Sequence, residues 1–223
     1  LLADYPAETL HETIPNFHNT VKRFSDFKKA VEKDACGRAA DVQKEIQFVL
    51  EREQLTHTLV DLQEAGKLPL RVTHNDTKLN NIMIDNATHK GICVIDLDTV
   101  MPGLSLNDFG DSIRFGASTA AEDEQDISKV FCDLHLFEVY VKGFLKGCGG
   151  ALTDLEVEML PMGAILMTFE CGMRFLADHL EGDHYFRIHR ENQNLDRART
   201  QFKLVWDMEQ KLSEMKAIVE KYK

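Results

Sequence analysis

The feature that most restricts how this chain can fold is a short segment, residues 70–102, whose hydrophobic pattern differs from that of the rest. Two apolar runs, residues 82–84 and 92–95, flank the turn-forming residues 85–87. Short apolar runs on both sides of a turn predict a β-hairpin. Because helical patterns occupy most of the remaining sequence, we expect an α+β fold that is mostly α and contains one small β-hairpin region.

Helical periodicity, with apolar residues about three or four positions apart, recurs on both sides of this segment. Thr153 and Glu156 form a capping box, which predicts the start of a long helix that ends near Leu180. Gly66 and Gly147 are the predicted ends of two other helices. The expected helices are a short one within residues 20–40 and longer ones over residues 41–65, 127–146, 153–180 and 195–222.

The overall charge argues against some classes of partner. The 223 residues include 26 Lys and Arg and 37 Asp and Glu, which gives a net charge of −11. Such a surface repels a phosphate backbone and an anionic membrane, so we expect neither nucleic acid nor a membrane as partner. The five cysteines show no paired spacing, which is typical of a reduced protein, and we expect a cytoplasmic location.

Polar side chains gather at the ends of the two predicted strands. Residues 73–81 read Thr-His-Asn-Asp-Thr-Lys-Leu-Asn-Asn before the first strand, and Asp96 and Asp98 follow the second. Because the strands of a hairpin place their outer ends side by side, we expect Asp76, Asn81, Asp96 and Asp98 to converge. Carboxylates buried together need a cation between them. Carboxylate and amide oxygens are hard ligands, which predicts Mg²⁺ rather than zinc.

Each part of this pattern has a simpler reading when it stands alone. A lone His-x-Asp or Asp-x-Asp is usually a turn or a helix cap. Here His-x-Asp-x-Lys-x-x-Asn is followed by a strand, a turn and a second strand that ends at Asp96, 20 residues after Asp76. A motif gains weight from its predicted structural context, so the complete pattern favours a functional site.

These residues resemble the catalytic core of the protein-kinase-like phosphotransferases, in particular the aminoglycoside phosphotransferase and choline kinase group. The resemblance implies that Asp76 positions or deprotonates the acceptor hydroxyl and that Lys78 lies near the γ-phosphate of ATP. It also implies that Asn81 and Asp96 hold Mg²⁺ on the nucleotide phosphates, with Asp98 as a weaker second metal contact. The chain departs from protein kinases at Asn75, where they carry Arg, and at residues 97–98, where they carry Phe-Gly.

Two further residues are predicted to support the catalytic loop, His74 and Asp108. Asp108 belongs to an Asp-Phe-Gly tripeptide that protein kinases use for metal binding, but it lies too far from Asp76 and beyond the strand end. We therefore expect Asp108 either to cap a helix that begins near Phe109 or to hold the catalytic loop in place.

A closer resemblance covers nearly the whole chain. Residues 14–20, 73–81, 94–103 and 174–186 look like the corresponding segments of bacterial N-acetylhexosamine 1-kinases. Those enzymes transfer the γ-phosphate of ATP to the anomeric hydroxyl of N-acetylglucosamine or N-acetylgalactosamine. The resemblance implies that Arg174 and Tyr185 help to hold the sugar, and His18 is a further candidate ligand. Glu170 and Asp178, four residues on either side of Arg174, are expected to form ion pairs along one helix face.

The expected domain is a kinase-like C-terminal lobe over residues 1–223, because residues 1–70 read as helical and contain no strand with a phosphate-gripping lysine. Without an N-terminal nucleotide-binding lobe, we expect the chain alone to be nearly inactive. The alternatives are a kinase for another small alcohol (an aminoglycoside, choline, homoserine or another sugar) and a non-catalytic kinase-like binding domain. The sequence selects neither the acceptor, the phosphate donor nor the oligomeric state.

Overall fold

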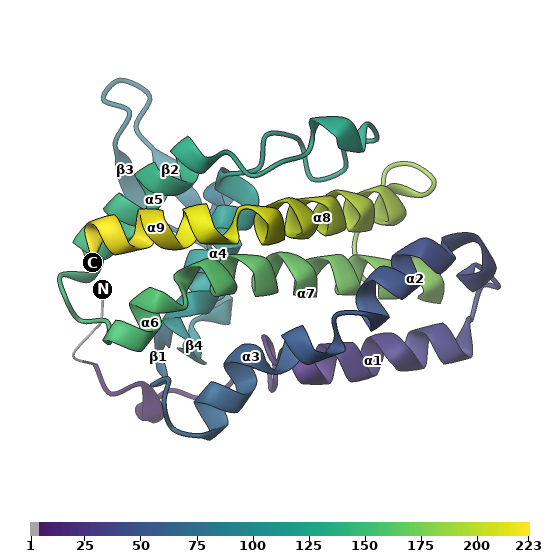
Figure 1. Cartoon of the computed structure of the whole chain (residues 1–223), viewed down its shortest axis with the longest axis horizontal. Helices are drawn as coiled ribbons and strands as arrows, with labels where there is room; N and C mark the ends of the chain where they lie inside the picture. Colours follow the sequence, from purple (N-terminus) through teal and green to yellow (C-terminus); the bar gives the residue numbers. More distant parts are fainter. Residues whose placement is uncertain (1–4) are drawn as a thin grey trace.

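The computed structural model describes residues 5–223, which form a mostly helical body with two small antiparallel sheets (Figure 1). This confirms the prediction of an α+β fold that is mostly α. The helices are α1 (Thr20–Lys33), α2 (Gln43–Leu50), α3 (Glu53–Glu64), α4 (Ser105–Gly116), α5 (Leu134–Cys148), α6 (Asp154–Glu158), α7 (Leu160–Glu181), α8 (Gln193–Gln210) and α9 (Leu212–Tyr222). The strands are β1 (Arg71–Thr73), β2 (Ile82–Ile84), β3 (Gly91–Val94) and β4 (Met101–Gly103).

Helix α7 is the centre of the core, and it packs against α1, α4 and α8 (Figure 1). Its length and composition would allow it to cross a membrane, but 78% of its most apolar stretch is buried inside the protein. A mostly apolar helix of a globular domain is stable when other elements cover it. The burial of α7 therefore fits a central core helix.

Four predicted helices have different boundaries in the structure. The helix expected over residues 41–65 is divided into α2 and α3, which pack on different partners, α8 and α1 respectively. The helix expected over residues 127–146 begins only at Leu134, where Asp133 caps it, and it continues to Cys148. The capping box at Thr153 is confirmed, but α6 ends at Glu158 before α7 begins. The last predicted helix is interrupted at Lys211.

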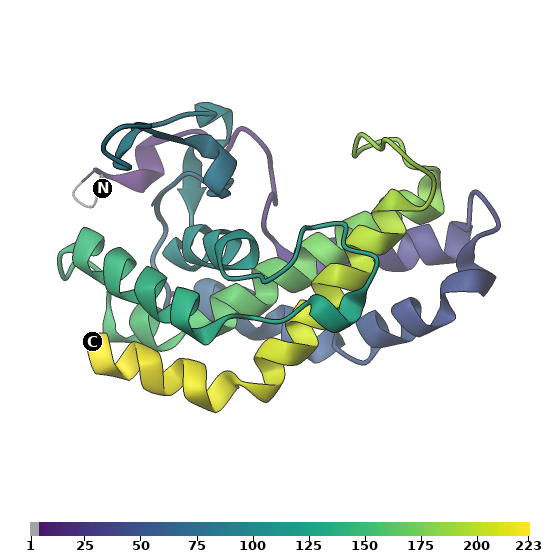
Figure 2. The ribbon, with the colours of Figure 1, turned by 90° about the horizontal axis from the view of Figure 1, so that it is seen from above.

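The predicted hairpin is confirmed as β2 and β3, paired antiparallel with Ile82 opposite Val94. A second pair, β1 and β4, aligns Thr73 with Met101 and lies at the base of the hairpin. Residues 74–81 and 95–100 connect the two pairs, so both predicted polar segments leave the same small region of sheet. The hairpin itself projects from the helical body (Figures 1 and 2).

Helices α4 and α7 approach each other closely at two glycines. A Cβ atom on Gly110 would lie 2.3 Å from the backbone oxygen of Gly163, and one on Gly163 would lie 2.7 Å from the backbone oxygen of Leu106. The neighbouring Phe109 is fully buried, with its ring edge-on to those of Phe137 and Phe144. The Phe-Gly part of the kinase-like tripeptide is therefore used here for helix packing.

Candidate active site

The residue before Asp76 is held in an unusual backbone conformation. Asn75 has a φ of 64°, the left-handed region that non-glycine residues rarely adopt. Its side-chain amide donates to the carbonyl oxygen of Thr99 at 3.0 Å, and its side-chain oxygen accepts from Thr73 Oγ1 at 3.0 Å. Its backbone carbonyl lies 2.9 Å from Nε2 of His18. These bonds fix the peptide that leads into Asp76.

Asp108 on α4 holds the same segment from the other side. Its carboxylate accepts the backbone N–H groups of His74 at 2.9 Å and Asn75 at 2.7 Å. Burial raises the pKa of Asp108, and these two hydrogen bonds oppose that shift. Helix α4 begins at Ser105 rather than near Phe109, so the predicted capping role was wrong. The geometry is instead that of the other alternative, a side chain that holds the loop.

His74 connects the loop to the end of strand β3. Its Nε2 lies 2.9 Å from the carbonyl oxygen of Ile95, which requires a proton on Nε2, and its Nδ1 accepts the backbone N–H of Asp76 at 3.3 Å. The neutral imidazole with its proton on Nε2 satisfies both contacts. His74 thereby links the segment around Asp76 to the residue directly before Asp96.

Asp76 is bound through one of its two carboxylate oxygens. Oδ2 accepts from Lys78 Nζ at 2.7 Å and from Asn81 Nδ2 at 2.9 Å, and the same Nδ2 lies 2.8 Å from the Asp76 carbonyl oxygen. Among the described residues, none donates to Oδ1, so this oxygen can accept from a ligand. Burial lowers the pKa of Lys78, but its hydrogen bond and charge interaction with Asp76 outweigh burial and raise it.

A cavity of about 620 Å³ opens above this carboxylate. This volume is within the range typical of small-molecule sites. Asp76, Lys78, Asp96 and Asp98 line one part of the cavity, and side chains of α7 and the following loop line another. The structure thus brings the predicted catalytic and metal residues, apart from Asn81 behind Asp76, onto the wall of one cavity.

Arg174 and Tyr185 face the same cavity. Arg174 Nη2 donates to the Tyr185 hydroxyl at 3.2 Å, and its guanidinium lies 5.5 Å from the centre of the Tyr185 ring. It is also within 5.7 Å of the ring centres of Phe17 and Phe186. Tyr185 is 71% exposed, so one side of its ring is open to a ligand.

One comparison with known proteins identifies the family. A sequence model described as the phosphotransferase enzyme family matches residues 2–132, more than half of the chain. The chain belongs to the phosphotransferase enzyme family. The matched region includes Asp76, Asn81 and Asp96, and enzymes of this family use ATP and a divalent metal in general.

The residues of this phosphotransferase partly fit a metal site. Within the described part of the chain, no three His, Cys, Asp or Glu side chains form a group that could hold a metal ion. Asp76, Asp96 and Asp98 line the same cavity, and Lys78 places a positive charge 2.7 Å from Asp76. The NH₂ group of Asn81 donates to Asp76, so the amide oxygen Oδ1 of Asn81 is available as a metal ligand. That oxygen and the carboxylate of Asp96 are suitable donors for Mg²⁺.

The expected ion pairs along α7 were only partly correct. Glu170 lies 4.0 Å from Arg174 Nη1 but makes a shorter contact, 3.1 Å, with Nδ1 of His18. Asp178 instead accepts three backbone N–H groups, from residues 184, 185 and 186, at 2.8–3.0 Å. Asp178 therefore fixes the loop that carries Tyr185, which a spacing of four residues does not reveal.

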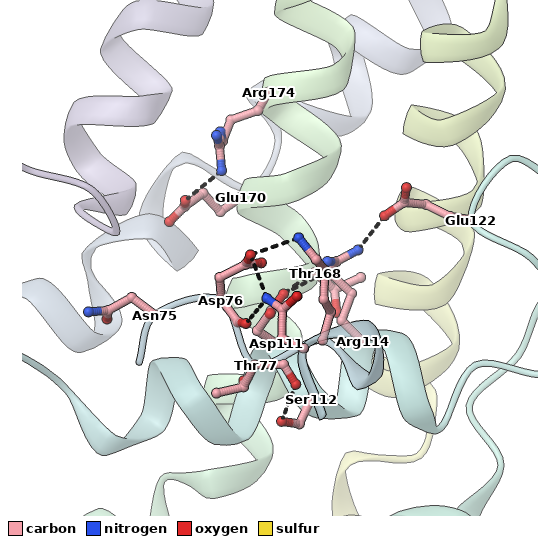
Figure 3. Close-up of polar contacts among 12 residues, drawn as sticks. Asn75, Asp76, Thr77, Asp111, Ser112, Arg114, Glu122, Thr168, Glu170 and Arg174 are labelled. Atoms are coloured by element: carbon pink, nitrogen blue, oxygen red, sulfur yellow. Dashed lines mark hydrogen bonds and ion pairs between the residues drawn. The ribbon is translucent and has the colours of Figure 1, made fainter. Parts of the chain in front are cut away.

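A buried arginine that was not predicted from the sequence also lines the cavity of this phosphotransferase. Arg114 Nε donates to Asp111 at 2.9 Å, and its Nη1 donates to Glu122 at 2.7 Å (Figure 3). All three side chains line the cavity. The available signal was the pair of opposite charges three residues apart, Asp111 and Arg114, shortly after Asp108 in the sequence.

Proposed function

We propose that the chain is the C-terminal lobe of an ATP- and Mg²⁺-dependent kinase that phosphorylates the anomeric hydroxyl of an N-acetylhexosamine. The observation that carries this proposal is the hydrogen bonding of the Asp76 carboxylate. One carboxylate oxygen is fixed by Lys78 and Asn81, and the other is available at a cavity that Arg174 and Tyr185 also line.

In the proposed mechanism, Asp76 Oδ1 accepts the hydrogen bond of the acceptor hydroxyl and aligns its oxygen for in-line attack on the γ-phosphorus. A bond forms between that oxygen and phosphorus, the bond between the γ-phosphorus and the leaving oxygen of ADP breaks, and the hydroxyl proton passes to Asp76. Lys78 offsets negative charge beside the transferred group. Asn81 and Asp96 would hold Mg²⁺, which neutralises charge on the phosphates when bound.

Several features support a neutral sugar as the acceptor. The guanidinium of Arg174 can donate to ring hydroxyl or acetamido oxygens, and the open side of the Tyr185 ring can cover a sugar face. The cavity is also nearly balanced in charge, with carboxylates and basic groups in similar numbers. Its acidic lining residues are Asp76, Asp96, Asp98, Asp111, Glu122 and Glu170, and its Lys and Arg lining residues are Lys78, Arg114, Arg174, Arg187 and Arg197.

The same features weaken two other acceptors. An aminoglycoside carries several positive charges and would need an excess of carboxylates, which this lining does not provide. Choline needs aromatic faces around its ammonium group. Arg174 already lies over three of the aromatic rings at this end of the cavity, those of Phe17, Tyr185 and Phe186. A quaternary ammonium would therefore compete with a fixed guanidinium.

The hairpin supports the proposal that a nucleotide-binding lobe covers this lobe. All seven residues of β2 and β3 are exposed, including Met83, Ile92 and Val94. A two-stranded hairpin is only marginally stable alone, and apolar side chains on both faces need a partner. We expect residues 1–223 alone to bind ATP weakly and to transfer little phosphate.

The direct test is ADP release by the chain together with its proposed upstream lobe, with ATP and Mg²⁺, across a panel of acceptors. The panel contains N-acetylglucosamine, N-acetylgalactosamine, glucose, galactose, choline, homoserine and an aminoglycoside. We expect the two N-acetylhexosamines to give the highest kcat/KM. A preference for any other member would replace the proposed acceptor, and binding of nucleotide without transfer to any of them would favour the non-catalytic alternative.

Arg174→Lys is expected to raise the KM for the acceptor about tenfold to a hundredfold, because loss of charged hydrogen bonds costs roughly 1.5–3 kcal/mol. Lys keeps the charge but loses the planar donor group. The KM for ATP should not change. Arg199→Lys is the matched control, because Arg199 on α8 pairs with Glu45 at 2.6 Å outside the cavity lining. An unchanged acceptor KM in Arg174→Lys would remove Arg174 from the sugar site.

A further inference from the structure

His18 makes two contacts that use both of its ring nitrogens. Nδ1 lies 3.1 Å from the Glu170 carboxylate, and Nε2 lies 2.9 Å from the backbone carbonyl of Asn75. The His18 side chain is only 7% exposed and that of Glu170 only 1%. Neither nitrogen is left to hydrogen-bond a sugar, although His18 is among the residues that line the cavity.

The chemistry of the two partners determines the protonation of His18. A carbonyl oxygen and an ionised carboxylate oxygen can only accept hydrogen bonds, so both ring nitrogens must donate. Only the imidazolium form carries a proton on both nitrogens. The contacts therefore require His18 to be positively charged, in contrast with the neutral His74 on the other side of Asp76.

The position of the Asn75 carbonyl gives this contact its importance. That carbonyl belongs to the peptide bond that joins Asn75 to Asp76, so a rotation of this peptide moves the Asp76 carboxylate. Asn75 has a left-handed conformation, which is intrinsically unfavourable for a residue other than glycine. The Asp108 carboxylate accepts the backbone N–H of Asn75, and His18 contacts the backbone C=O of the same residue. His18 thus completes the restraint on the peptide that carries the proposed catalytic residue.

Charged groups surround His18 on three elements. Glu170 and Arg174 are on α7, Arg23 on α1 has its Nε 3.9 Å from Glu170, and Asp108 and Asp111 are on α4. Burial lowers the pKa of His18, but the charge and hydrogen bond of Glu170, together with the Asn75 carbonyl, outweigh burial and raise it above 6.5. Burial likewise raises the pKa of Glu170, and the charge of His18 outweighs it and lowers that pKa.

The geometry points to His18 as a positioning residue that, in its charged form, connects Glu170 to the peptide bond preceding Asp76. This replaces the role of sugar ligand that the sequence predicted for it, and it rests on the proposed function only in calling Asp76 catalytic. Because Glu170 also contacts Arg174, the same carboxylate links the acceptor side of the cavity to the catalytic loop. The charged form of His18 is favoured below its raised pKa, and the restraint weakens as the pH rises through that value.

The first test measures His18 directly and needs no activity. NMR of the 223-residue chain labelled with ¹⁵N-histidine should show two ring N–H protons on His18 at pH 7. His57, whose Nδ1 lies 3.2 Å from Asp61 and which is not among the residues that line the cavity, is the internal comparison. Glu170→Gln should lower the pKa of His18, because it removes the opposing charge. A neutral His18 at pH 7, or an unchanged titration in Glu170→Gln, would overturn the assignment.

The second test separates positioning from simple structural support. In His18→Gln, the NMR signals of Asp76 and its neighbours should shift, with a midpoint of thermal unfolding close to that of the parent. In the protein with its upstream lobe, kcat should fall about tenfold to a hundredfold with the KM for ATP unchanged, since small misplacement of a reacting group has effects of that size. The alkaline decrease of kcat in the parent should be absent from His18→Gln and should move to lower pH in Glu170→Gln.

His57→Gln is the matched control and should alter none of these values. Unchanged Asp76 signals in a folded His18→Gln protein would refute the inference, as would an identical alkaline decrease in the parent and in that variant. If the parent transfers phosphate to no acceptor, the proposed function fails while the NMR results still decide the role of His18.

Discussion

Asp76→Asn is expected to reduce kcat by about 10²–10⁴-fold, the range that a positioned proton acceptor contributes. The structure adds a specific reason. Lys78 and Asn81 both donate to Oδ2 of Asp76. In the variant, the amide oxygen must take that place, because an NH₂ group cannot accept from them. The NH₂ group then faces the cavity, so a hydrogen-bond donor replaces the acceptor that the hydroxyl of the proposed substrate requires.

The measurement is ADP release with the preferred acceptor, combined with ATP binding by calorimetry, in the protein with its proposed upstream lobe. Nucleotide affinity should stay close to that of the parent, because the variant keeps the shape of the side chain. Asp61→Asn is a matched control, since Asp61 lies exposed on α3 and its side chain contacts His57. Turnover within a few fold of the parent in Asp76→Asn would mean that Asp76 is not the proton acceptor.

Gly110→Ala is expected to destabilise the fold by about 3 kcal/mol, at the upper end of the usual cost of overpacking. The added methyl group would lie 2.3 Å from the backbone oxygen of Gly163. A backbone oxygen inside a helix cannot rotate away as a flexible side chain can, so α4 and α7 would have to separate. Because α4 also carries Asp108, the separation should loosen the loop around Asp76 as well.

Gly116→Ala, on the same helix, is the control for this substitution. Apart from its chain neighbours and the backbone of its own helix, no heavy atom of the described residues lies within 4 Å of the Cβ position at Gly116. The change should therefore be neutral or stabilise by up to about 1 kcal/mol. Urea unfolding of both variants measures the difference in the free energy of unfolding. Equal stability of the two variants would show that the contact between α4 and α7 adjusts easily.

Features that depend on neighbouring residues could be predicted from the sequence. The hairpin follows from two apolar runs around a turn, and the capping box follows from Thr153 and Glu156 three residues apart. Both signals act within a few residues. The polar segment that contains Asp76 was recognised for the same reason, because its spacing is local and its connection to the hairpin is short.

Features that depend on residues far apart in the sequence could not be predicted. The break between α2 and α3 coincides with Arg52, whose guanidinium binds Glu209, 157 residues away, at 2.8 and 2.9 Å. His18 was predicted as a candidate sugar ligand. The contacts that occupy its two nitrogens could not be foreseen, because their partners are 57 and 152 positions away in the sequence. Asp178 was predicted to form an ion pair because it lies four residues from Arg174. Its actual partners, the backbone N–H groups of a returning loop, have no signature in the sequence.

The β2–β3 hairpin has a consequence for handling residues 1–223 alone. Both of its strands are edge strands, since within residues 5–223 each pairs only with the other. Their outer N–H and C=O groups lie beside exposed apolar side chains, a combination that promotes strand pairing between molecules and aggregation. The lobe that we propose to cover the hairpin would then also keep the protein soluble, so a preparation of these residues alone is expected to aggregate as its concentration rises.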